Sequence, residues 1–391
     1  MSFRILTLNQ ISARGLARLP ADRYQVGADI SAPDAILVRS AELHGAGIAA
    51  SVRAIGRAGV GVNNIPVDDM SRRGVPVFNT PGANANAVKE LVLAALLLAA
   101  RNIGPAWLFA RGLSGDDSAI EAAVEAGKKR FVGFELPGRT LGVVGLGAVG
   151  VEVANSALAL GMKVLGYDPQ LTVQRAWQLS SSAEQAASLE DLFARSDAIT
   201  LHVPLNEATR ALVNGARLAR MRDGGTILNF ARAAIVDEAA VVAALDAGRL
   251  HAYVCDFPKR ALKDHARVIT LPHLGASTSE AEENCAIMVA EQVRDFLENG
   301  NIRNSVNYPD TVLPRVPGTT RLGVANRNVP NMVGQISTAL AARGINIADL
   351  LNKSRGEYAY TLIDVDAEDA RGAELLGEIR AIDGVLSARV I

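Results

Sequence analysis

The chain has 391 residues, of which 40 are basic and 41 acidic, and its formal net charge is −1. This length is enough for about two to four domains with cores of their own. The near-zero charge excludes the strong surface field that attracts nucleic acid or an anionic membrane, so we expect neither as a partner.

The N-terminal stretch, the longest apolar run and the cysteine count indicate the cellular compartment and whether a metal is bound. The N-terminal stretch MSFRILTLN lacks the long apolar core of a signal peptide. The longest strongly apolar run, residues 91–100, has about half the length of a bilayer span. Cys255 and Cys285 are too few for a disulfide framework or a zinc site. We therefore expect a cytoplasmic protein without a bound metal.

Four apolar runs near the N-terminus have the length of buried strands, with helical or turn-rich segments between them. They lie at residues 4–8, 35–38, 52–55 and 75–78. This alternation predicts an α/β layer with a mostly parallel sheet. Three of the runs are followed by polar or glycine-rich loops, and the ligands of open α/β sheets bind at such carboxyl ends.

A strand, a glycine turn and a helix follow one another from residue 139. Residues 140–144 are apolar and β-branched, and Gly145, Gly147 and Gly150 have the spacing Gly-x-Gly-x-x-Gly. The first glycine permits a tight turn, the second lets the backbone approach a pyrophosphate, and the third allows close packing of helix and strand. The unit therefore predicts a dinucleotide site at the start of the helix.

The strand at residues 163–167 ends in Asp168, eighteen residues after Gly150. An acid at this position accepts hydrogen bonds from the adenosine ribose and repels a 2′-phosphate. No arginine follows at residues 169–171 to hold that phosphate. Asp168 therefore predicts NAD rather than NADP as the cofactor.

Further strand-like runs continue the α/β pattern to residue 273 and complete a doubly wound nucleotide domain. Ser277 and Glu280 form a predicted capping box for one long amphipathic helix that runs to Asn299. The position of this helix, after the nucleotide domain, predicts a return to the first domain.

Three prolines between residues 303 and 320 predict an extended linker. The remainder has the order βαββαβ of a ferredoxin-like module. Its predicted elements are strands at residues 321–325, near Leu350, at 359–366 and at 387–391, with helices at 332–343 and 369–381.

One histidine and one arginine follow strands, where a nicotinamide enzyme needs a proton carrier and charge stabilisation. His273 in LPHLGAST follows a strand, and an imidazole there exchanges protons near neutrality; the alternative is a loop histidine without a catalytic task. Arg232 in LNFARAAIVDE also ends a strand and can grip a carboxylate bidentately; the alternative is a salt bridge at a helix start. His202 ends a strand as well and is expected to line the cofactor cleft.

The motifs GLGAVG, YDP, HVPLNEAT, NFARAAIVDE and LPHLGAST resemble, in this order, those of D-2-hydroxyacid dehydrogenases. GRAGVGVNNI and NTPGANANAVKELV resemble the 3-phosphoglycerate dehydrogenase branch, and the C-terminal module resembles an ACT domain. The resemblance implies an α/β protein with a flavodoxin-like substrate domain, a doubly wound Rossmann NAD domain and a ferredoxin-like ACT domain. It also implies oxidation of 3-phospho-D-glycerate with NAD, at the start of L-serine biosynthesis.

Residue roles and boundaries carried over from the resemblance are expectations at this point. The acid/base is His273, and Arg232 binds the carboxylate and carbonyl of the substrate. The cofactor positions are Gly145, Gly147, Ala148, Val149, Gly150, Asp168, Val203, Phe230, Ala231, Asp256, His273, Gly275 and Ala276, and the substrate positions are Arg39, Ser40, Gly59, Val60, Gly61 and Asn84. The expected boundaries are 1–85 for the substrate domain, 86–276 for the NAD domain, 277–305 for the return helix, 306–319 for the linker and 320–391 for the ACT domain.

The chain departs from the family motif DVFxxEP, in which the aspartate meets the nicotinamide and the glutamate pairs with the catalytic histidine. Here the motif is CDFPKRALKD, with Cys255 and Arg260 at those two positions. We expect Asp256 to take the first role with a shift of one residue. The second role passes to Asp264, or His273 works without a carboxylate partner. Two alanines replace the pair of glycines that commonly follows Arg232 in the family.

The ACT-like module departs from the serine-inhibited relatives in one effector position. Asn326 stands where those relatives have a histidine, whereas Asn328 and Asn346 match. We expect both matching asparagines at the same end of the module, offering amide groups to serine. The alternative is an oligomerisation module without a ligand. The resemblance also implies a homodimer or homotetramer.

Two alternative functions remain. The first is a dehydrogenase of an unphosphorylated 2-hydroxy acid, since the candidates for a phosphate site are only Arg39, Lys89 and the basic run 128–130, which is also typical of a solvated face. The second is a non-catalytic NAD-binding regulator, which the absent glutamate permits. Retention of both Arg232 and His273 argues against a regulator.

Overall fold

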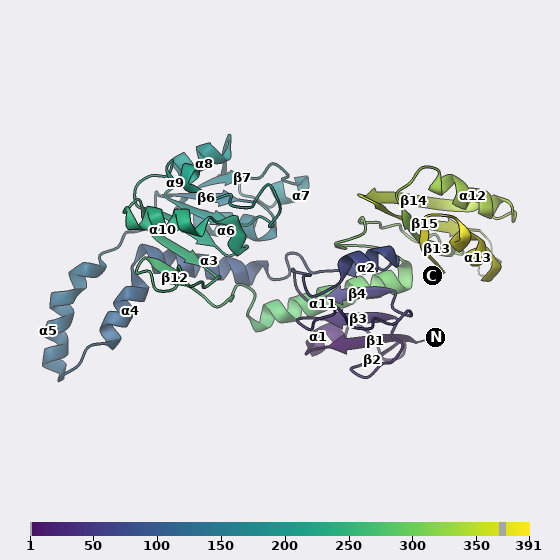
Figure 1. Cartoon of the computed structure of the whole chain (residues 1–391), viewed down its shortest axis with the longest axis horizontal. Helices are drawn as coiled ribbons and strands as arrows, with labels where there is room; N and C mark the ends of the chain where they lie inside the picture. The colour runs from purple at the N-terminus through teal and green to yellow at the C-terminus, as the bar shows by residue number, and fades with distance from the viewer. Residues whose placement is uncertain (1, 367–372) are drawn as a thin grey trace. The chain divides into compact units, whose positions relative to one another are not determined.

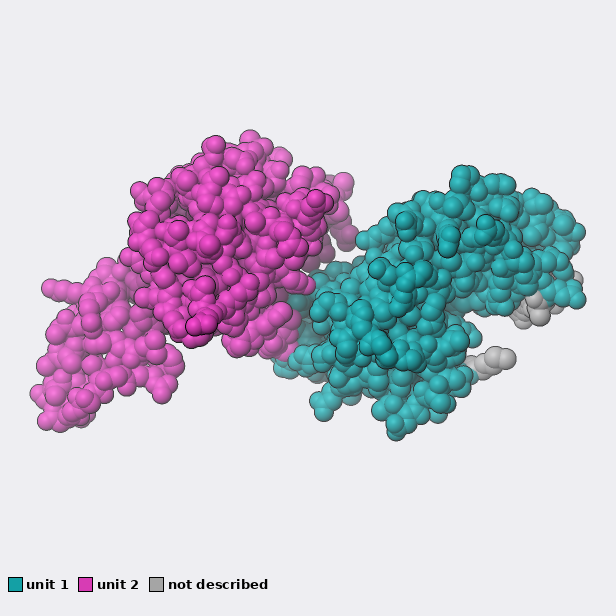
Figure 2. All heavy atoms as spheres, in the orientation of Figure 1, with its two compact units in different colours: residues 1–84, 279–391 teal, residues 85–278 magenta. Residues whose placement is uncertain are grey.

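The computed structural model describes residues 2–366 and 373–391. The chain forms two compact units (Figure 2). Unit 1 contains residues 1–84 and 279–391, and unit 2 contains residues 85–278. The chain therefore leaves unit 1 once and returns to it.

Unit 1 begins with a five-stranded parallel sheet of order β2-β1-β3-β4-β5 (Figure 1). This order is flavodoxin-like, which confirms the predicted fold of the substrate domain. The strands are β1 (Phe3–Leu8), β2 (Tyr24–Gly27), β3 (Ala35–Val38), β4 (Ala54–Arg57) and β5 (Val77–Phe78), with helices α1 (Ala13–Leu16) and α2 (Val67–Arg72).

Sequence reasoning missed one strand and misplaced the start of two. β2 is a short edge strand in which only Tyr24 is buried, so it lacks the apolar signal of the other strands. The predictions for β4 and β5 begin two residues early. Val52 donates its N–H to the carbonyl of Ala49 in a turn, and Pro76 directly precedes β5 and has no N–H for a ladder.

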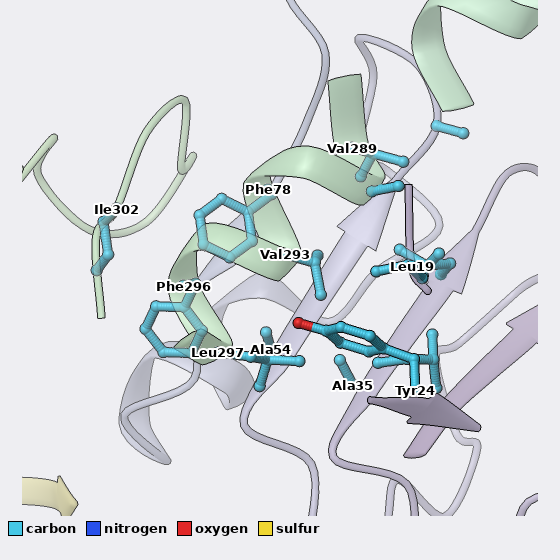
Figure 3. Close-up of a cluster of buried hydrophobic side chains, with 14 of the residues drawn as sticks. Leu19, Tyr24, Ala35, Ala54, Phe78, Val289, Val293, Phe296, Leu297 and Ile302 are labelled. Carbon is cyan, nitrogen blue, oxygen red and sulfur yellow. The ribbon is translucent and has the colours of Figure 1, made fainter. Parts of the chain in front are cut away.

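Helix α11 (Ser279–Asn299) supplies much of the core under this sheet. Val289, Val293, Phe296 and Leu297 from α11 pack with Phe78 of β5 and with residues of β3 and β4 (Figure 3). The helix begins at Ser279, so its N-cap is Thr278 and the predicted N-cap at Ser277 was wrong by one residue. Ser277 instead donates its backbone N–H to the carbonyl of Leu274 in the preceding turn.

The proline-containing segment 300–319 packs on the first sheet. Tyr308 is fully buried, and its hydroxyl donates to the carbonyl of Ser71 at 2.7 Å. The amide of Asn307 accepts from the backbone of Val77 and donates to the carbonyl of Val75. The segment is therefore ordered by buried polar contacts although it contains no regular element.

The C-terminal module is an antiparallel sheet of order β14-β15-β13-β16 with two helices. This topology confirms the predicted ferredoxin-like arrangement. Its core includes Leu322, Ile336, Ile363 and Ile379. The elements are β13 (Thr320–Arg327), α12 (Met332–Ala341), β14 (Ile347–Arg355), β15 (Tyr358–Val365), α13 (Ala373–Ala381) and β16 (Val385–Val390). Residues 369–372 of the predicted last helix lie outside the described residues.

Unit 2 contains a seven-stranded parallel sheet of order β12-β11-β10-β9-β6-β7-β8. Starting from β6, the strands follow the Rossmann order, which confirms the doubly wound prediction. The strands are β6 (Thr140–Val144), β7 (Lys163–Tyr167), β8 (Glu184–Gln185), β9 (Ala198–Leu201), β10 (Gly225–Asn229), β11 (Leu250–Cys255) and β12 (Val268–Thr270). The helices around it are α3 (Ala85–Ala100), α6 (Ala148–Ala159), α7 (Val173–Ala176), α8 (Leu189–Arg195), α9 (Gly215–Leu218) and α10 (Glu238–Asp246), with the 3-10 turns η1 (Lys128–Phe131) and η2 (Ala233–Ile235).

Two helices, α4 (Ile103–Arg111) and α5 (Asp117–Gly127), extend away from the sheet of unit 2 (Figure 1). No residue of α4 is buried, and Trp107 and Leu108 are 56% and 65% exposed. Within residues 2–366 and 373–391, no single helix has the length and hydropathy of a membrane span; α3 and α4 meet that test only as a pair bent by 69°.

Candidate active site

The glycine turn after β6 has the geometry of a dinucleotide-binding turn. Gly145 has φ +90°, and a Cβ atom there would lie 2.6 Å from the carbonyl oxygen of His202. A Cβ atom at Gly150 would lie 1.9 Å from the carbonyl oxygen of Gly145, so this glycine permits the turn and α6 to touch. A Cβ atom at Gly147 would meet no atom within 4 Å, which leaves open space for a ligand beside the backbone.

The N-terminus of α6 is free to bind an anion. Gly147 is the N-cap and provides no side-chain hydrogen bond, so the amides of Ala148 and Val149 begin the helix without a side-chain cap. These amides and the helix dipole suit a pyrophosphate. Asp168 ends β7, and its carboxylate accepts the N–H of Leu146 at 2.8 Å and the N–H of Gln170 at 2.8 Å. The residues present therefore fit NAD.

His202 and Val203 follow β9 at the same sheet edge. The Nε2 atom of His202 lies 2.9 Å from the hydroxyl oxygen of Thr200. Burial lowers the pKa of His202 to about 4. This side chain is therefore neutral near pH 7 and is a weaker base than an unperturbed imidazole.

Arg232 stands just beyond β10 and is held there through its backbone. The buried amide of Asn229 donates to the carbonyl of Arg232 at 3.0 Å and accepts the N–H of Ala231 at 3.2 Å. Phe230 is buried behind this turn. The guanidinium of Arg232 is exposed and donates to the carbonyl of Ala231 at 2.6 Å, so its other donors remain available to a carboxylate.

His273 lies on a strained loop beyond β12. Its φ is +58°, an uncommon left-handed conformation for a residue other than glycine. Asp256 holds this loop, because its two carboxylate oxygens accept the N–H of Leu274 at 2.9 Å and the N–H of Gly275 at 2.7 Å. The ring of Phe257 packs edge-on against the imidazole of His273.

Asp256, which we expect to meet the cofactor, is engaged with the His273 loop in this structure. Asp256 is 1% exposed, and both of its oxygens bond to backbone amides of the His273 loop. Its position supports the loop instead. Cys255, at the family's aspartate position, is a buried free thiol.

Asp264 does not meet His273. The Asp264 side chain is 77% exposed, and it accepts a hydrogen bond from its neighbour Lys263 at 2.5 Å. Across the described residues no hydrogen bond or ion pair joins a carboxylate to His273. Of the two alternatives left by the sequence, the structure favours a histidine without a carboxylate partner.

In unit 1, the predicted substrate positions occupy loops at the carboxyl ends of strands. Arg39 follows β3 and forms an ion pair with Glu282 at 2.5 Å. The N–H of Ser40 is bonded to the side chain of Asn9 at 3.0 Å. Gly59, with φ +148°, begins the Gly59, Val60 and Gly61 loop after β4, and Asn84 closes the segment before α3.

Sequence reasoning overlooked Arg57 at the end of β4. A Cβ atom at Gly59 would lie 1.6 Å from Nη1 of Arg57, so the guanidinium lies against the glycine loop. Its Nε atom donates to the carbonyl of Arg39 at 3.1 Å. The signal was present in the motif GRAGVG, where an arginine ends a strand just before a glycine loop.

The expectation that Asn328 and Asn346 lie at the same end of the module is wrong within one chain. Asn328 follows β13 and donates to the carbonyl of Gly356 at 3.0 Å, whereas Asn346 precedes β14 and donates to Asp366 at 2.6 Å. β13 and β14 both pair antiparallel with β15, so the end of one and the start of the other lie at opposite edges of the sheet. Asn326 is 1% exposed, with its Nδ2 donating to the carbonyl of Arg327.

In the described part of the chain, no group of three or more His, Cys, Asp or Glu side chains is placed to hold a metal ion.

Known proteins match both the sequence and this arrangement. The family profile "D-isomer specific 2-hydroxyacid dehydrogenase, NAD binding domain" matches residues 103–275. The D-3-phosphoglycerate dehydrogenase of Haemophilus influenzae is 33% identical over 352 residues, which cover 86% of this chain and 81% of that one. This chain belongs to the D-2-hydroxyacid dehydrogenase family, in its D-3-phosphoglycerate dehydrogenase branch.

Two further relatives support the assignment. The D-3-phosphoglycerate dehydrogenase of Archaeoglobus fulgidus is 39% identical over 286 residues, which cover 71% of this chain and 52% of that one, so this chain spans about half the length of that relative. The NAD+-bound 3-phosphoglycerate dehydrogenase of Entamoeba histolytica superposes with a TM-score of 0.61 at 26% identity, covering 78% of this chain and 99% of that one. The chain is an NAD-dependent oxidoreductase.

Proposed function

We propose that this dehydrogenase oxidises 3-phospho-D-glycerate to 3-phosphohydroxypyruvate in the cytoplasm, the first step of L-serine biosynthesis. The observation that carries the proposal is the placement of Arg232 and His273 at the carboxyl edge of one sheet, beyond β10 and β12, which flank β11. The relatives named above support the substrate.

The proposed catalytic groups have separate tasks. NAD, when bound, accepts the hydride from C2 of the substrate. Arg232 binds the substrate carboxylate and polarises the oxygen at C2. The imidazole of His273 takes the proton of the 2-hydroxyl, so that the alcohol loses one hydride and one proton and becomes a ketone. The amides of Ala148 and Val149, the carboxylate of Asp168 and the turn at Gly147 hold the cofactor.

We assign the substrate's anionic groups in unit 1 to the Gly59–Gly61 loop and to Arg57, which lies against that loop. The basic run 128–130 is less suited to hold the phosphate. Lys128 is paired with Glu125, and Arg130 of the same run lies over the ring of Phe109. This basic run therefore belongs to the helical extension that includes α5.

An assay of NADH formation tests the substrate directly. We expect turnover with 3-phosphoglycerate to exceed that with lactate, glycerate and 2-hydroxyglutarate. His273→Ala should lower kcat by about 10²- to 10⁴-fold, and Arg232→Gln should lower kcat and raise KM together. Faster turnover of an unphosphorylated acid would favour the first alternative function. Absence of turnover with intact NAD binding would favour a regulator.

We also propose that the C-terminal module is an ACT domain that responds to serine. Because Asn328 and Asn346 lie at opposite edges of one sheet, a site containing both requires Asn346 from a second copy of the chain. Calorimetry with millimolar serine should detect binding that Asn346→Ala removes. An absence of heat, with unchanged activity, would leave the module an oligomerisation element.

We further propose that the protein forms at least a homodimer, through the helical extension of unit 2. Trp107, Leu108 and Ile103 expose apolar surface on α4, and unpartnered apolar surface of this kind marks protein contacts. Light scattering at micromolar concentration should give at least twice the 41.1 kDa of one chain. Trp107→Glu should shift the protein toward the monomer, and a wild-type monomer would contradict the proposal.

A further inference from the structure

Unit 1 contains a pocket of about 330 Å³ between the C-terminal module and the first sheet. This volume is at the lower end of the range of about 300 to 1,000 Å³ that is typical of small-molecule sites. Its charged lining residues come from both parts of the unit: Arg4, Asp34, Arg53 and Arg73 from the first sheet domain, and Arg380 and Arg389 from the module. We call it the arginine pocket.

The arginine pocket lies at the sheet edge opposite to the proposed substrate loops. Arg4 lies near the start of β1, Asp34 directly precedes β3, and Arg53 directly precedes β4. The Arg39 and Gly59 loops instead follow the carboxyl ends of β3 and β4. In a parallel sheet these two sets of residues lie at opposite edges, so the pocket is separate from the substrate positions of unit 1.

The positive charge of the pocket is poorly neutralised. Asp34 is the one acidic residue among its described lining residues, and it pairs with Arg53 at 3.4 Å. Arg73 donates to the carbonyls of Ile48 and Ala49, and Arg380 donates to the carbonyl of Ala388. Carbonyl groups orient these guanidinium groups but carry no compensating charge.

The partly buried Arg389 and the buried Tyr360 also line this pocket. Arg389 lies over the ring of Phe296 at 4.2 Å and donates to the carbonyl of Phe296. Burial lowers the pKa of Arg389, as the charge of Arg53 also does. Tyr360 lines the pocket and is 3% exposed, yet its hydroxyl makes no hydrogen bond of normal geometry with the described residues. The Tyr360 hydroxyl therefore has no well-formed hydrogen bond, and the lining carries five arginines against one aspartate. Both features favour an anionic ligand.

We propose that the arginine pocket binds a small oxyanion, a phosphate or carboxylate group, and is an effector site separate from catalysis. Guanidinium groups bind such oxyanions through paired, charge-assisted hydrogen bonds. Because the lining comes from both the module and the first sheet domain, the bound anion stabilises their packing. This site does not depend on the identity of the substrate.

Calorimetry on the full-length protein with inorganic phosphate and, separately, with malonate tests the site. Arg53→Gln and Arg380→Gln remove one cation from each side of the pocket, and each should weaken anion binding about tenfold or more. Arg18→Gln is the matched control, because Arg18 is an exposed arginine of the same unit that pairs with Glu291 away from the pocket lining. The ratio of the two affinities shows whether phosphate or carboxylate is preferred.

Anion binding at the proposed catalytic site is distinguished by Arg232→Gln. Heat that survives in Arg232→Gln but is lost in Arg53→Gln and Arg380→Gln assigns the anion to the arginine pocket. The proposal is wrong if only Arg232→Gln loses anion binding. It is also wrong if neither phosphate nor malonate binds the wild-type protein at about ten millimolar. Circular dichroism of each variant shows whether it is folded. Arg53 and Arg380 lie on different elements, so if one of these two variants fails to fold, the other still tests the pocket.

Discussion

The imidazole of His273 lies edge-on to the ring of Phe257, with the ring centroids 5.5 Å apart and the planes at 71°. In the described residues no carboxylate bonds to this histidine, so an aromatic edge contact orients the proposed acid/base. An aromatic pair of this kind contributes about 0.5 to 1.5 kcal/mol beyond area burial.

Replacement of Phe257 by leucine should therefore lower kcat about two- to tenfold, with KM nearly unchanged. The matched control is Phe134→Leu, because Phe134 packs on His251 with similar geometry, 5.3 Å and 67°, but outside the proposed site. Steady-state kinetics of both variants test whether Phe257 positions His273. Equal effects of the two substitutions would remove the positioning role of Phe257.

Asp256→Asn should loosen the loop that carries His273. An asparagine retains one acceptor oxygen but presents its NH₂ group to the second backbone N–H, which costs about 1 to 3 kcal/mol at a buried site. We expect lower stability in urea and lower kcat. Asp264→Asn, an exposed change in the same segment, should alter neither. A fall in kcat for Asp264→Asn alone would instead support Asp264 as the histidine's partner.

Asp168 is expected to set the preference for NAD. Asp168→Asn retains an acceptor for the N–H of Leu146 but removes the charge that repels a 2′-phosphate. The ratio of kcat/KM for NAD to that for NADP should fall in this variant. If the wild-type protein used both cofactors equally well, Asp168 would have no role in discrimination.

His202 makes stability depend on pH. Its pKa is about 4 in the folded protein and 6.5 in the reference state, so the unfolded chain binds more protons between these values. Stability is full above pH 6.5 and is lost as the pH falls toward 4, by about 1 to 2 kcal/mol at pH 5. Urea unfolding at pH 7 and pH 5 should show a smaller loss for His202→Gln than for the wild type. His44→Gln, at an exposed histidine, should keep the wild-type loss.

The buried ion pair between Arg321 and Asp364 connects the C-terminal module to its surroundings. Both side chains are fully buried, and Arg321 also donates to the carbonyls of Asn299 and Leu313. Arg321→Met leaves the Asp364 carboxylate without its cation and should cost about 3 to 5 kcal/mol in denaturant unfolding.

Two control variants test whether the loss of stability in Arg321→Met comes from the unpaired charge. Adding Asp364→Leu to Arg321→Met should restore part of the lost stability, because no buried charge then remains unpaired. Arg343→Met removes an exposed arginine that pairs with Glu378 and should change stability little. A double variant that is no more stable than Arg321→Met would show that the other contacts of Arg321 dominate.

Features of the fold that depend on local pattern could be predicted from the sequence. The spacing of Gly145, Gly147 and Gly150 predicted the strand, turn and helix of unit 2. A Cβ atom at Gly145 or at Gly150 would meet a backbone carbonyl oxygen, so only glycine fits at these two positions. Apolar runs predicted most strands of both parallel sheets, because buried parallel strands need continuous hydrophobic residues. The strand β2 was not predicted, because an edge strand with one buried residue lacks that signal.

The contacts between side chains that are distant in sequence could not be predicted in this way. The bond of Asp256 to the His273 loop, the contact of Phe257 with His273 and the separation of Asn328 from Asn346 all depend on strand order and direction. The arginine pocket joins Arg53 to Arg389, which lie in opposite halves of the chain. Hydrophobic periodicity specifies which face of an element is buried, but the residue that it meets there is set by packing between elements remote in sequence.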